Sequence, residues 1–248
     1  MSKVWYVIPA RRNSKGLKFK NRKLLEYTLS TIPPVLKKQV IVTTDDEKIL
    51  DECLKQDISC ISRKSHLAAD DTDIKSVMKD VMKTKSIPDE DIIVMLYLTY
   101  PERSWHHIHD TLNFFVRNNS SSLLCAKEVK SHPYLCVYEE NGQQIVKHNL
   151  YRRQDYPKCL EISHYVCIFF VGEIKKLNKN MYNKDTTYYR IDQVIDVDHK
   201  KDFDSFIERK KYDKDNSRNW DKSQAVAQKL RGTVIKTPEG ELFVKSER

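Results

Sequence analysis

The chain has 248 residues, of which 40% are hydrophobic and 32% are charged. This composition supports a buried core and excludes a disordered chain. The length fits one large α/β domain, or a core with a small appendage, and is too short for two full-sized domains. The net charge of +9 favours an anionic partner, which would be nucleic acid, an anionic membrane or a multiply charged phosphate substrate.

No targeting segment or membrane span is expected. The longest apolar stretch, Ile92 to Pro101, is much shorter than the roughly 18 residues of a membrane span. The apolar start Val4–Ala10 runs straight into Arg11 and Arg12, unlike a signal peptide. The cysteines have no C-x-x-C or other metal-binding spacing, so we expect reduced, mostly buried thiols in a cytoplasmic protein. They are Cys53, Cys60, Cys125, Cys136, Cys159 and Cys167.

The chain opens with a strand, a loop and a helix. Lys3–Pro9 is rich in Val, Ile and aromatic residues and predicts a strand, and leucines over Leu24–Leu29 predict the helix. Val40–Thr43 predicts a second strand. Thr44–Glu47 has the spacing of a capping box that would open a helix through Leu54. A short third strand is expected at Ile58–Ile61.

The middle of the chain continues the alternation of strands and helices. Apolar residues recur with helical spacing from Ile74 to Met82 and predict an amphipathic helix over 70–84. The apolar run Ile92–Leu98 suits a strand buried on both faces, as in a parallel sheet. A helix over Trp105–Phe115 and a strand over Leu123–Ala126 follow.

From Tyr134 to Val146 the pattern changes to short strands around Asn141-Gly142, which predicts an antiparallel excursion that could serve as a dimerisation arm. Buried strands return at Tyr165–Val171 and Val194–Val197. A turn at Pro238-Glu239-Gly240 predicts a hairpin over Thr233–Val244.

The order of elements predicts an α/β fold with a mostly parallel, Rossmann-like sheet flanked by helices. Ligands of such sheets bind at the carboxyl ends of the strands. We divide the chain into a core domain at 1–207, which contains the excursion at 130–160, and a charged extension at 208–248.

A basic loop joins the first strand to the first helix. It contains no acidic residue, and with the start of the helix it carries seven basic residues: Arg11, Arg12, Lys15, Lys18, Lys20, Arg22 and Lys23. Backbone N–H groups at a helix start, with Ser14 and Asn21, can hold phosphate oxygens while Arg and Lys neutralise them. The lone Gly16 fits neither a Walker loop nor a dinucleotide motif. The alternatives are a solvated loop and, for Asn21, a helix cap.

Asp196 and Asp198 stand two residues apart on a predicted strand, which puts both carboxylates on one face. Paired carboxylates suit Mg²⁺ together with substrate phosphate and water. The alternative is an ordinary surface alternation.

Seven segments carry a family resemblance: Ile8–Gly16 with Lys20-Asn21, Val42–Glu47, Leu67–Asp70, Thr99–Arg103, His132-Pro133, Arg152–Pro157 and Ile195–Asp198. In this order, over about residues 3 to 205, they resemble the CMP-N-acylneuraminate (CMP-sialic acid) synthetases, cytidylyltransferases that activate 2-keto sugar acids. The resemblance implies transfer of CMP from CTP to a sugar acid with release of pyrophosphate. It also implies Mg²⁺ or Mn²⁺ as cofactor and a homodimer, rather than a nucleic-acid or membrane partner.

The resemblance also assigns roles to individual residues. The catalytic pair would be Arg11 and Lys20, and the rest of the triphosphate loop Ser14, Lys15 and Asn21. The cytosine site would be Arg63, Ala68 and Thr72, the sugar site Tyr97, Arg103, His132 and Arg153, and the metal site Asp196 and Asp198. Arg63 could instead be a solvated loop arginine, and His132 could be structural.

Two departures from the family pattern border its sugar pocket. In the segment where the family reads L-Q-P-T-S-P, Tyr97 replaces Gln, Leu98 replaces Pro and Tyr100 replaces Ser. Ile162-Ser163-His164 stands where the family reads P-N-G. The nucleotide chemistry is therefore better supported than the identity of the sugar.

Other interpretations remain open. The D-x-D motif also occurs in metal-dependent glycosyltransferases, but only about fifty residues follow it, too few for an acceptor region. The third interpretation is a nonenzymatic polyanion-binding protein that keeps the synthetase fold but has drifted in sequence. The histidines of Trp105–His109 fit a solvated helix face better than a metal site, because consecutive helix positions diverge by about 100°. Arg209-Lys210-Lys211 would be a solvated face or bind an acidic partner.

Overall fold

The computed structural model describes residues 2–213, 235–237 and 240–242. The chain divides into two compact units, residues 1–198 and 199–248. In the second unit, residues 200–213 are helical, and β10 (Ile235–Thr237) pairs antiparallel with β11 (Gly240–Leu242). This pairing confirms the predicted C-terminal hairpin, although Pro238 and Glu239 of its turn lie outside the described residues.

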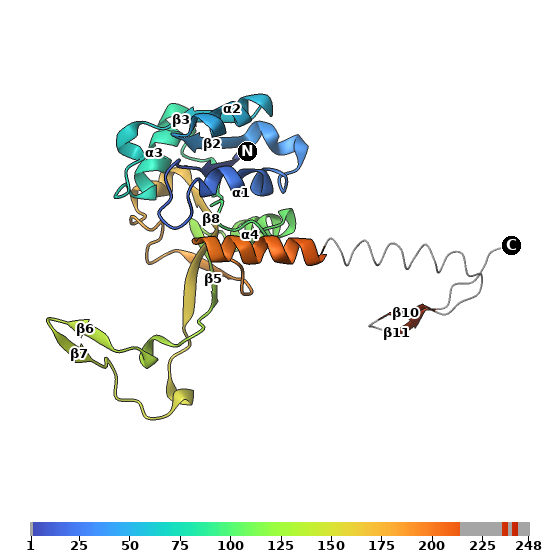
Figure 1. The fold of residues 1–248 in the computed structure, drawn as a ribbon. Helices are drawn as coiled ribbons and strands as arrows, with labels where there is room; N and C mark the ends of the chain where they lie inside the picture. Colours follow the sequence, from blue (N-terminus) through green and yellow to red (C-terminus); the bar gives the residue numbers. More distant parts are fainter. Residues whose placement is uncertain (1, 214–234, 238–239, 243–248) are drawn as a thin grey trace. The chain divides into compact units, whose positions relative to one another are not determined.

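A seven-stranded sheet forms the centre of the first unit (Figure 1), in the order β3-β2-β1-β4-β8-β5-β9. Every neighbouring pair is parallel except the two that β8 makes with β4 and β5. The prediction of a mostly parallel sheet is therefore confirmed. The strands are β1 (Val4–Pro9), β2 (Val40–Thr44), β3 (Ser59–Ser62), β4 (Ile92–Met95), β5 (Ser122–Glu128), β8 (Leu160–Phe170) and β9 (Thr187–Arg190).

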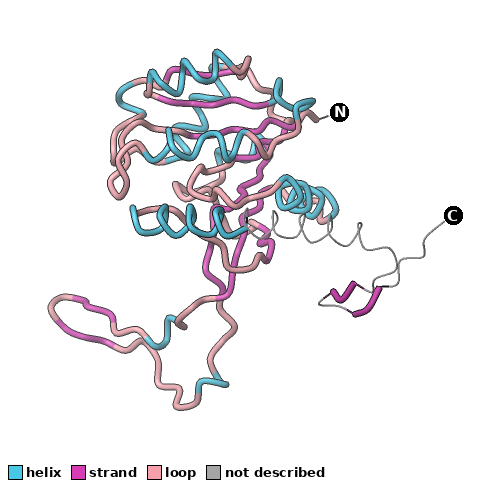
Figure 2. The backbone as a smooth tube through the Cα atoms, turned by 45° about the vertical axis from the view of Figure 1, so that its right-hand side comes forward, coloured by secondary structure: helices cyan, strands magenta, loops and turns pink. Residues whose placement is uncertain are grey.

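Helices cover both faces of this sheet (Figure 2). Val77 and Val81 of α3 pack on the face that carries Val7 of β1. Trp105 of α4 meets Tyr6, on the opposite face of β1, in an edge-to-face contact with ring centroids 5.7 Å apart. The α-helices of this unit are α1 (Lys20–Leu29), α2 (Glu47–Lys55), α3 (Ile74–Thr84) and α4 (Trp105–Arg117), and the 3₁₀ turns are η1 (Pro34–Gln39), η2 (Ser65–Leu67), η3 (Pro133–Leu135), η4 (Arg153–Asp155) and η5 (Val171–Lys175).

Two predicted helix starts are wrong. Asp46, not Thr44, caps α2 through a hydrogen bond from the Lys48 N–H to its carboxylate (3.1 Å). Thr44 remains in β2, where its hydroxyl donates to the carbonyl oxygen of Ala10. Likewise Asp73 accepts from the N–H of Ser76, so α3 begins at Ile74 and residues 70–73 lie before it.

The strand predicted at Val194–Val197 is also absent from the described structure, because residues 191–198 have no strand partner. Instead the Val197 N–H donates to the carbonyl oxygen of Thr99 (2.8 Å), and this bond holds the segment beside the end of β4. Conversely β9, which the sequence did not suggest, pairs with β5 at the edge of the sheet. The predicted strand Ile92–Leu98 stops at Met95.

The predicted antiparallel excursion is present as residues 129–159, which we call the arm. It carries the hairpin of β6 (Tyr138–Glu140) and β7 (Gln143–Ile145), which Figure 1 shows beyond the ends of β5 and β8. Asn141 and Gly142 turn the hairpin with φ of 53° and 77°, the left-handed pair typical of a two-residue turn. At its base the rings of Tyr134 and His148 stack at 4.3 Å.

Within the described residues, no helix has the length and apolar character needed to cross a bilayer. All six cysteines are free thiols. Cys53, Cys125 and Cys167 are buried, so the expectation of mostly buried thiols holds for half of them.

Candidate nucleotide and metal site

The loop of residues 11–19, which we call the basic loop, follows β1 at the carboxyl edge of the sheet. The side chain of Asn21 donates to the carbonyl oxygen of Arg11 (2.8 Å) and so fixes the start of this loop. Asn21 is not a helix cap, because α1 begins at Lys20 after Phe19 in a left-handed conformation. The N–H of Arg12 donates to Asp45 at the end of β2 (2.7 Å).

A pocket of about 400 Å³ opens within the basic loop, lined by Arg12, Asn13, Ser14, Lys18, Phe19 and Asp45. Ser14, which the sequence predicts to be a phosphate ligand, is thus part of the wall of this pocket. Behind it, Arg22 forms an ion pair with the buried Asp46 (2.6 Å), which ties the start of α1 to the start of α2.

Arg11 and Lys15 converge on one carboxylate. Asp70 lies 2.7 Å from Arg11 and 3.5 Å from Lys15. Desolvation raises the pKa of Asp70, but the hydrogen bond from Arg11 and the charges of Lys15 and Arg11 outweigh it and leave the pKa lowered. The sequence contained Asp70 within its Leu67–Asp70 motif but suggested no role for it. The two cations are thus arranged to hold a shared anionic group.

Lys20 and Asp198 are 178 positions apart in the sequence and meet in a 2.8 Å ion pair. The Lys20 side chain is only 10% exposed, whereas that of Asp198 is 62% exposed. This contact brings the basic loop and the acidic pair, the two segments with predicted chemical roles, to one place.

Asp196 is partly buried beside Thr99 and Tyr100. Its Oδ1 atom is buried without a hydrogen-bond partner. Burial raises the pKa of Asp196, and this exceeds the lowering by contacts with Tyr100 and Thr99. Burial also raises the pKa of Tyr100, as does the charge of Asp196. In the sequence, Tyr100 stands out only as a departure from the family pattern, and nothing there predicts its contact with Asp196.

The acidic pair fits a magnesium ion. An unpartnered buried oxygen on Asp196 and an exposed carboxylate on Asp198 are hard oxygen donors. No group of three or more His, Cys, Asp or Glu side chains among the described residues could hold a metal by itself. Mg²⁺ in phosphoryl-transfer sites is bound by one or two carboxylates, with substrate phosphate and water completing the shell.

Arg63 is 7% exposed and is therefore not a solvated loop arginine. It donates to the carbonyl oxygen of Thr43 (2.9 Å), and its Nε atom is buried without a partner. Burial lowers the pKa of Arg63. In the loop that follows, the N–H of Ala68 and the hydroxyl of Thr72 both bond to main-chain carbonyls, so these groups maintain the turn.

Tyr97 and His164, which belong to the two departures, lie against each other. Their rings meet edge to face with centroids 5.7 Å apart. His164 also hydrogen-bonds the carbonyl oxygen of Asn180 (2.9 Å). The sequence could not place these segments side by side, because they are more than sixty residues apart.

Arg103 is 2% exposed, and its guanidinium hydrogen-bonds to groups inside the protein. Its guanidinium donates to the carbonyl oxygens of Tyr165 (2.6 Å) and Tyr97 (2.9 Å) and contacts the hydroxyl of Thr28 (3.4 Å). Burial lowers its pKa to about 10, which leaves it charged at neutral pH. Arg103 therefore holds β8 to the end of β4, while its buried Nε atom has no hydrogen-bond partner.

The other two residues expected at the sugar site lie in the arm. The ring of His132 bonds to the Tyr134 N–H (3.1 Å) and the Pro157 carbonyl oxygen (2.9 Å), so both of its nitrogens are used by the main chain. Arg153 is exposed in η4. Both residues lie in the arm, whereas Tyr97 follows β4.

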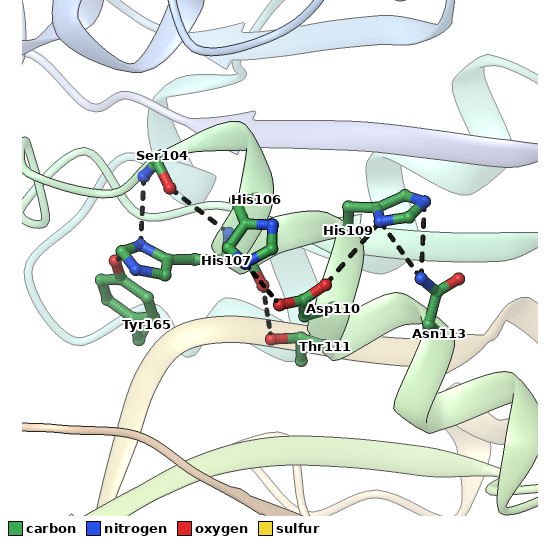
Figure 3. A network of polar contacts seen from close by, with 8 residues as sticks. All are labelled: Ser104, His106, His107, His109, Asp110, Thr111, Asn113 and Tyr165. Atoms are coloured by element: carbon green, nitrogen blue, oxygen red, sulfur yellow. Dashed lines mark hydrogen bonds and ion pairs between the residues drawn. The ribbon is translucent and has the colours of Figure 1, made fainter. Parts of the chain in front are cut away.

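The histidines at the start of α4 separate into two groups (Figure 3). His106 and His109 are exposed and flank Asp110 at 3.1 and 3.8 Å, as a solvated helix face predicts. His107 is exposed as well, but it contacts the hydroxyl of Tyr165 (2.6 Å) and completes a capping box with Ser104.

A mostly parallel sheet with helices on both faces, a basic loop after its first strand and an acidic pair beside that loop define a nucleotidyltransferase of Rossmann-like fold. Residues 5–211 match the family described as Cytidylyltransferase, and the chain belongs to this CTP-dependent family.

Two curated proteins are similar to this chain over most of its length. Post-translational flagellin modification protein B of Campylobacter coli is 28% identical over 219 residues, which cover 82% of this chain and 93% of that protein. N-acylneuraminate cytidylyltransferase of Streptococcus agalactiae serotype V is 29% identical over 215 residues, 79% of this chain and 51% of that enzyme. The chain thus spans about half the length of the streptococcal enzyme.

Solved structures support the fold. A CMP:2-keto-3-deoxy-manno-octonic acid synthetase complexed with CTP superposes with a TM-score of 0.60 at 13% identity, over 86% of this chain and 100% of that chain. A cytidylyltransferase from Leptospira borgpetersenii gives a TM-score of 0.53 at 16% identity, over 82% and 84% of the two chains.

Proposed function

We propose that this cytidylyltransferase transfers CMP from CTP to a 2-keto sugar acid of the nonulosonic type and releases pyrophosphate. The observation that carries the proposal is the Lys20–Asp198 contact, which joins the basic loop to the acidic pair. The names of the streptococcal and octonic acid relatives are consistent with a sugar-acid substrate.

In the proposed reaction a sugar hydroxyl oxygen forms a bond to the α-phosphorus of CTP, and the bond from that phosphorus to the β-phosphate oxygen breaks. The hydroxyl proton is lost to solvent or to a nearby base. Catalysis of this kind is largely positioning and charge stabilisation. Mg²⁺ held by Asp196 and Asp198 would neutralise charge on the phosphate oxygens when bound.

The chain's own residues supply the remaining charge. Arg11 and Lys15 would release Asp70 and bind phosphate oxygens in its place. Ser14 would donate a hydrogen bond to the phosphate from the basic loop. The Lys20 ammonium group would leave Asp198 and bind the phosphate. This interaction would strengthen in the transition state, as negative charge grows on the phosphate oxygens. Arg63, with its unpartnered Nε, would face the cytosine near Ala68 and Thr72.

The sugar pocket would be bounded by the Tyr97–His164 contact. Tyr97 offers a single hydroxyl on a large ring, where a Gln would offer two donors and an acceptor. A pocket built around a hydrogen bond discriminates strongly when that pairing is lost. This supports a sugar acid whose substituents differ from those of N-acetylneuraminate.

A homodimer formed through the arm is part of the proposal. The arm exposes apolar side chains that a monomer leaves in water, namely Leu135, Val137, Val146, Leu150 and Tyr151. Contiguous exposed apolar residues are typical of protein interfaces. In such a dimer Arg153 would be available to a sugar carboxylate in the partner's site, since it is exposed in η4.

The experiment is an incubation of the full chain with CTP, Mg²⁺ and each of N-acetylneuraminate, legionaminate, pseudaminate and deoxyoctulosonate. Pyrophosphate release is the readout. We expect release with at least one acid and none without acid or Mg²⁺. Absence of release with every acid, together with tight binding to nucleic acid, would reject the proposal in favour of a polyanion binder.

A further inference from the structure

The two segments that depart from the family pattern touch each other at two points. One is the contact between the rings of Tyr97 and His164. At the other, the Ser163 hydroxyl donates to the hydroxyl of Tyr100 at 3.5 Å. Both of these side chains are buried, with Ser163 3% and Tyr100 6% exposed. The proposed sugar pocket uses the first contact and leaves the second without a role.

Tyr100 is held firmly at both its ring and its backbone. The ring packs edge to face on that of Tyr165 with centroids 5.4 Å apart, and the carbonyl oxygen accepts from the N–H of Arg103 (3.2 Å). Because the Tyr100 hydroxyl oxygen accepts from Ser163, its own O–H is left to donate. The acceptor beside this O–H is the carboxylate of Asp196. Tyr100 is thus a fixed donor next to one member of the acidic pair.

The main chain brings Asp196 to this donor. The Val197 N–H donates to the carbonyl oxygen of Thr99 (2.8 Å), so the segment of Asp196 runs beside that of Tyr100. The carboxylate of Asp196 contacts the side chains of Thr99 and Tyr100, while its Oδ1 atom is buried without a hydrogen-bond partner. Carboxylates that bind metals are themselves hydrogen-bonded by neighbouring groups, which fix their orientation. Asp196 is therefore arranged as a metal ligand whose supporting groups are already in place.

We propose that Tyr100 is a positioning residue, which orients Oδ1 of Asp196 toward the divalent cation by donating a hydrogen bond to the Asp196 carboxylate. Tyr100 acts only through Asp196, and Ser163 directs the Tyr100 proton toward that carboxylate. The inference rests on the proposed function in one respect, that Asp196 holds the cation when CTP is bound. It places Tyr100, a departure from the family pattern, at the metal end of the site and not at the sugar.

The test measures how much Mn²⁺ improves the binding of CTP to the full chain. Calorimetric titration gives the CTP affinity in saturating Mn²⁺ and in EDTA, and the ratio of the two affinities is the metal-dependent gain. A change in the fold or in the basic loop would alter both affinities and cancel in the ratio. We expect Tyr100→Phe to lower the ratio by about tenfold, because loss of a group that orients a metal ligand weakens metal binding by that order.

Two further variants show through which residue Tyr100 acts. Tyr6→Phe is the matched control, since it removes the hydroxyl of another buried tyrosine, which packs on Trp105 from β1, and it should keep the parent's ratio. Asp196→Asn should lower the ratio. Adding Tyr100→Phe to Asp196→Asn should lower it no further, because the carboxylate that Tyr100 orients is already gone.

Three results would overturn the inference. The first is a ratio in Tyr100→Phe equal to or above that of the parent, and the second is an additional loss in the double variant. The third is a parent ratio equal to that of Asp196→Asn, which would show that Asp196 holds no metal. Failure of the proposed function would look different: pyrophosphate release with none of the sugar acids would reject CMP transfer, while a Tyr100-dependent ratio that vanishes in the Asp196→Asn background would still support the role of Tyr100.

Discussion

Lys20 carries its ammonium group to Asp198 on a side chain that is otherwise buried, so its position is set before the nucleotide arrives. We expect Lys20→Met to lower kcat/KM by about a hundredfold, because an interaction that strengthens in the transition state is lost. Arg11→Ala should weaken CTP binding by about tenfold, an effect that shrinks at high salt since Arg11 is partly exposed.

Titration calorimetry and pyrophosphate release measure both effects. Lys55→Ala on α2 is the control for loss of a positive charge away from the site. CTP affinity and turnover equal to the parent in both Lys20→Met and Arg11→Ala would remove the basic loop from the site.

Replacing Asp196 or Asp198 by Asn should have the same effect on turnover. The two replacements should differ in their effect on thermal stability. Either Asp→Asn change should lower Mg²⁺-dependent turnover by about a hundredfold, because an amide keeps the shape and loses the charge. Asp196→Asn should not lower Tm in chelator, since it removes a partly buried charge. Thermal unfolding and turnover with and without EDTA check this. Full parent activity in excess chelator would contradict the metal role.

Tyr97 is where sugar specificity is expected to lie. Tyr97→Gln should raise kcat/KM for N-acetylneuraminate relative to the other sugar acids, because Gln restores two donors and an acceptor. His164→Gly should act in the same direction by removing the ring that Tyr97 contacts. Competition between acids, scored by kcat/KM ratios, is the measurement. A parent that already prefers N-acetylneuraminate, and a variant with the same ratios, would exclude both residues as specificity determinants.

At the scale of elements, the start of α4 contains a pH-sensitive contact. Burial is the largest cause lowering the pKa of His107; His106 and Arg103 lower it further, and Asp110 and Asp192 raise it. Because the folded pKa lies below the usual value of about 6.5, the unfolded chain binds the extra proton first on acidification. Stability should therefore be complete above about pH 7 and fall as the pH drops below about 6.5.

Urea unfolding between about pH 8 and about pH 5 measures this dependence. His107→Gln should flatten it, whereas His66→Gln, which changes an exposed histidine outside α4, should leave it as in the parent. An equal pH slope in His107→Gln and the parent would show that His107 does not contribute.

Elements with a strong local pattern could be predicted from the sequence, and elements made by distant partners could not. The spacing of apolar residues indicated α3 and α4, and the apolar runs indicated β1 and β2. The four residues of β9 contain no such run and become a strand only by pairing with β5. Thr44 has the sequence spacing of a capping residue, but its hydroxyl donates to the carbonyl oxygen of Ala10, thirty-four positions away, and does not cap α2.

The same distinction applies to the site. Motifs located Lys20 and Asp198 as separate features, but their contact depends on the order of strands. A motif also cannot tell whether an arginine faces a ligand or a carbonyl. Arg103 matches the family pattern and is occupied by the main chain of β8 and of the β4 end.

At the scale of the whole molecule, the arm should decide the oligomeric state. Val137→Asp combined with Tyr151→Asp should convert a dimer to monomer, because charges replace apolar side chains at the interface. Tyr151 is 96% exposed in the single chain, so its replacement should not harm folding. Light scattering after gel filtration is the measurement. Val35→Asp with Leu54→Asp is the control, since both are exposed and lie outside the arm; equal masses in the two double variants would remove the arm from the interface.

β8 lies between β4 and β5 but is synthesised after both of them. Until residues 160–170 leave the ribosome, each of these two strands has an edge without its partner, and open edges pair readily with other chains. The arm lies between β5 and β8 in the sequence, so its synthesis delays the pairing of β4 and β5 with β8. During this interval the growing chain is most prone to aggregate. Shortened chains for expression should therefore end beyond Phe170, and chains that stop within the arm should be insoluble.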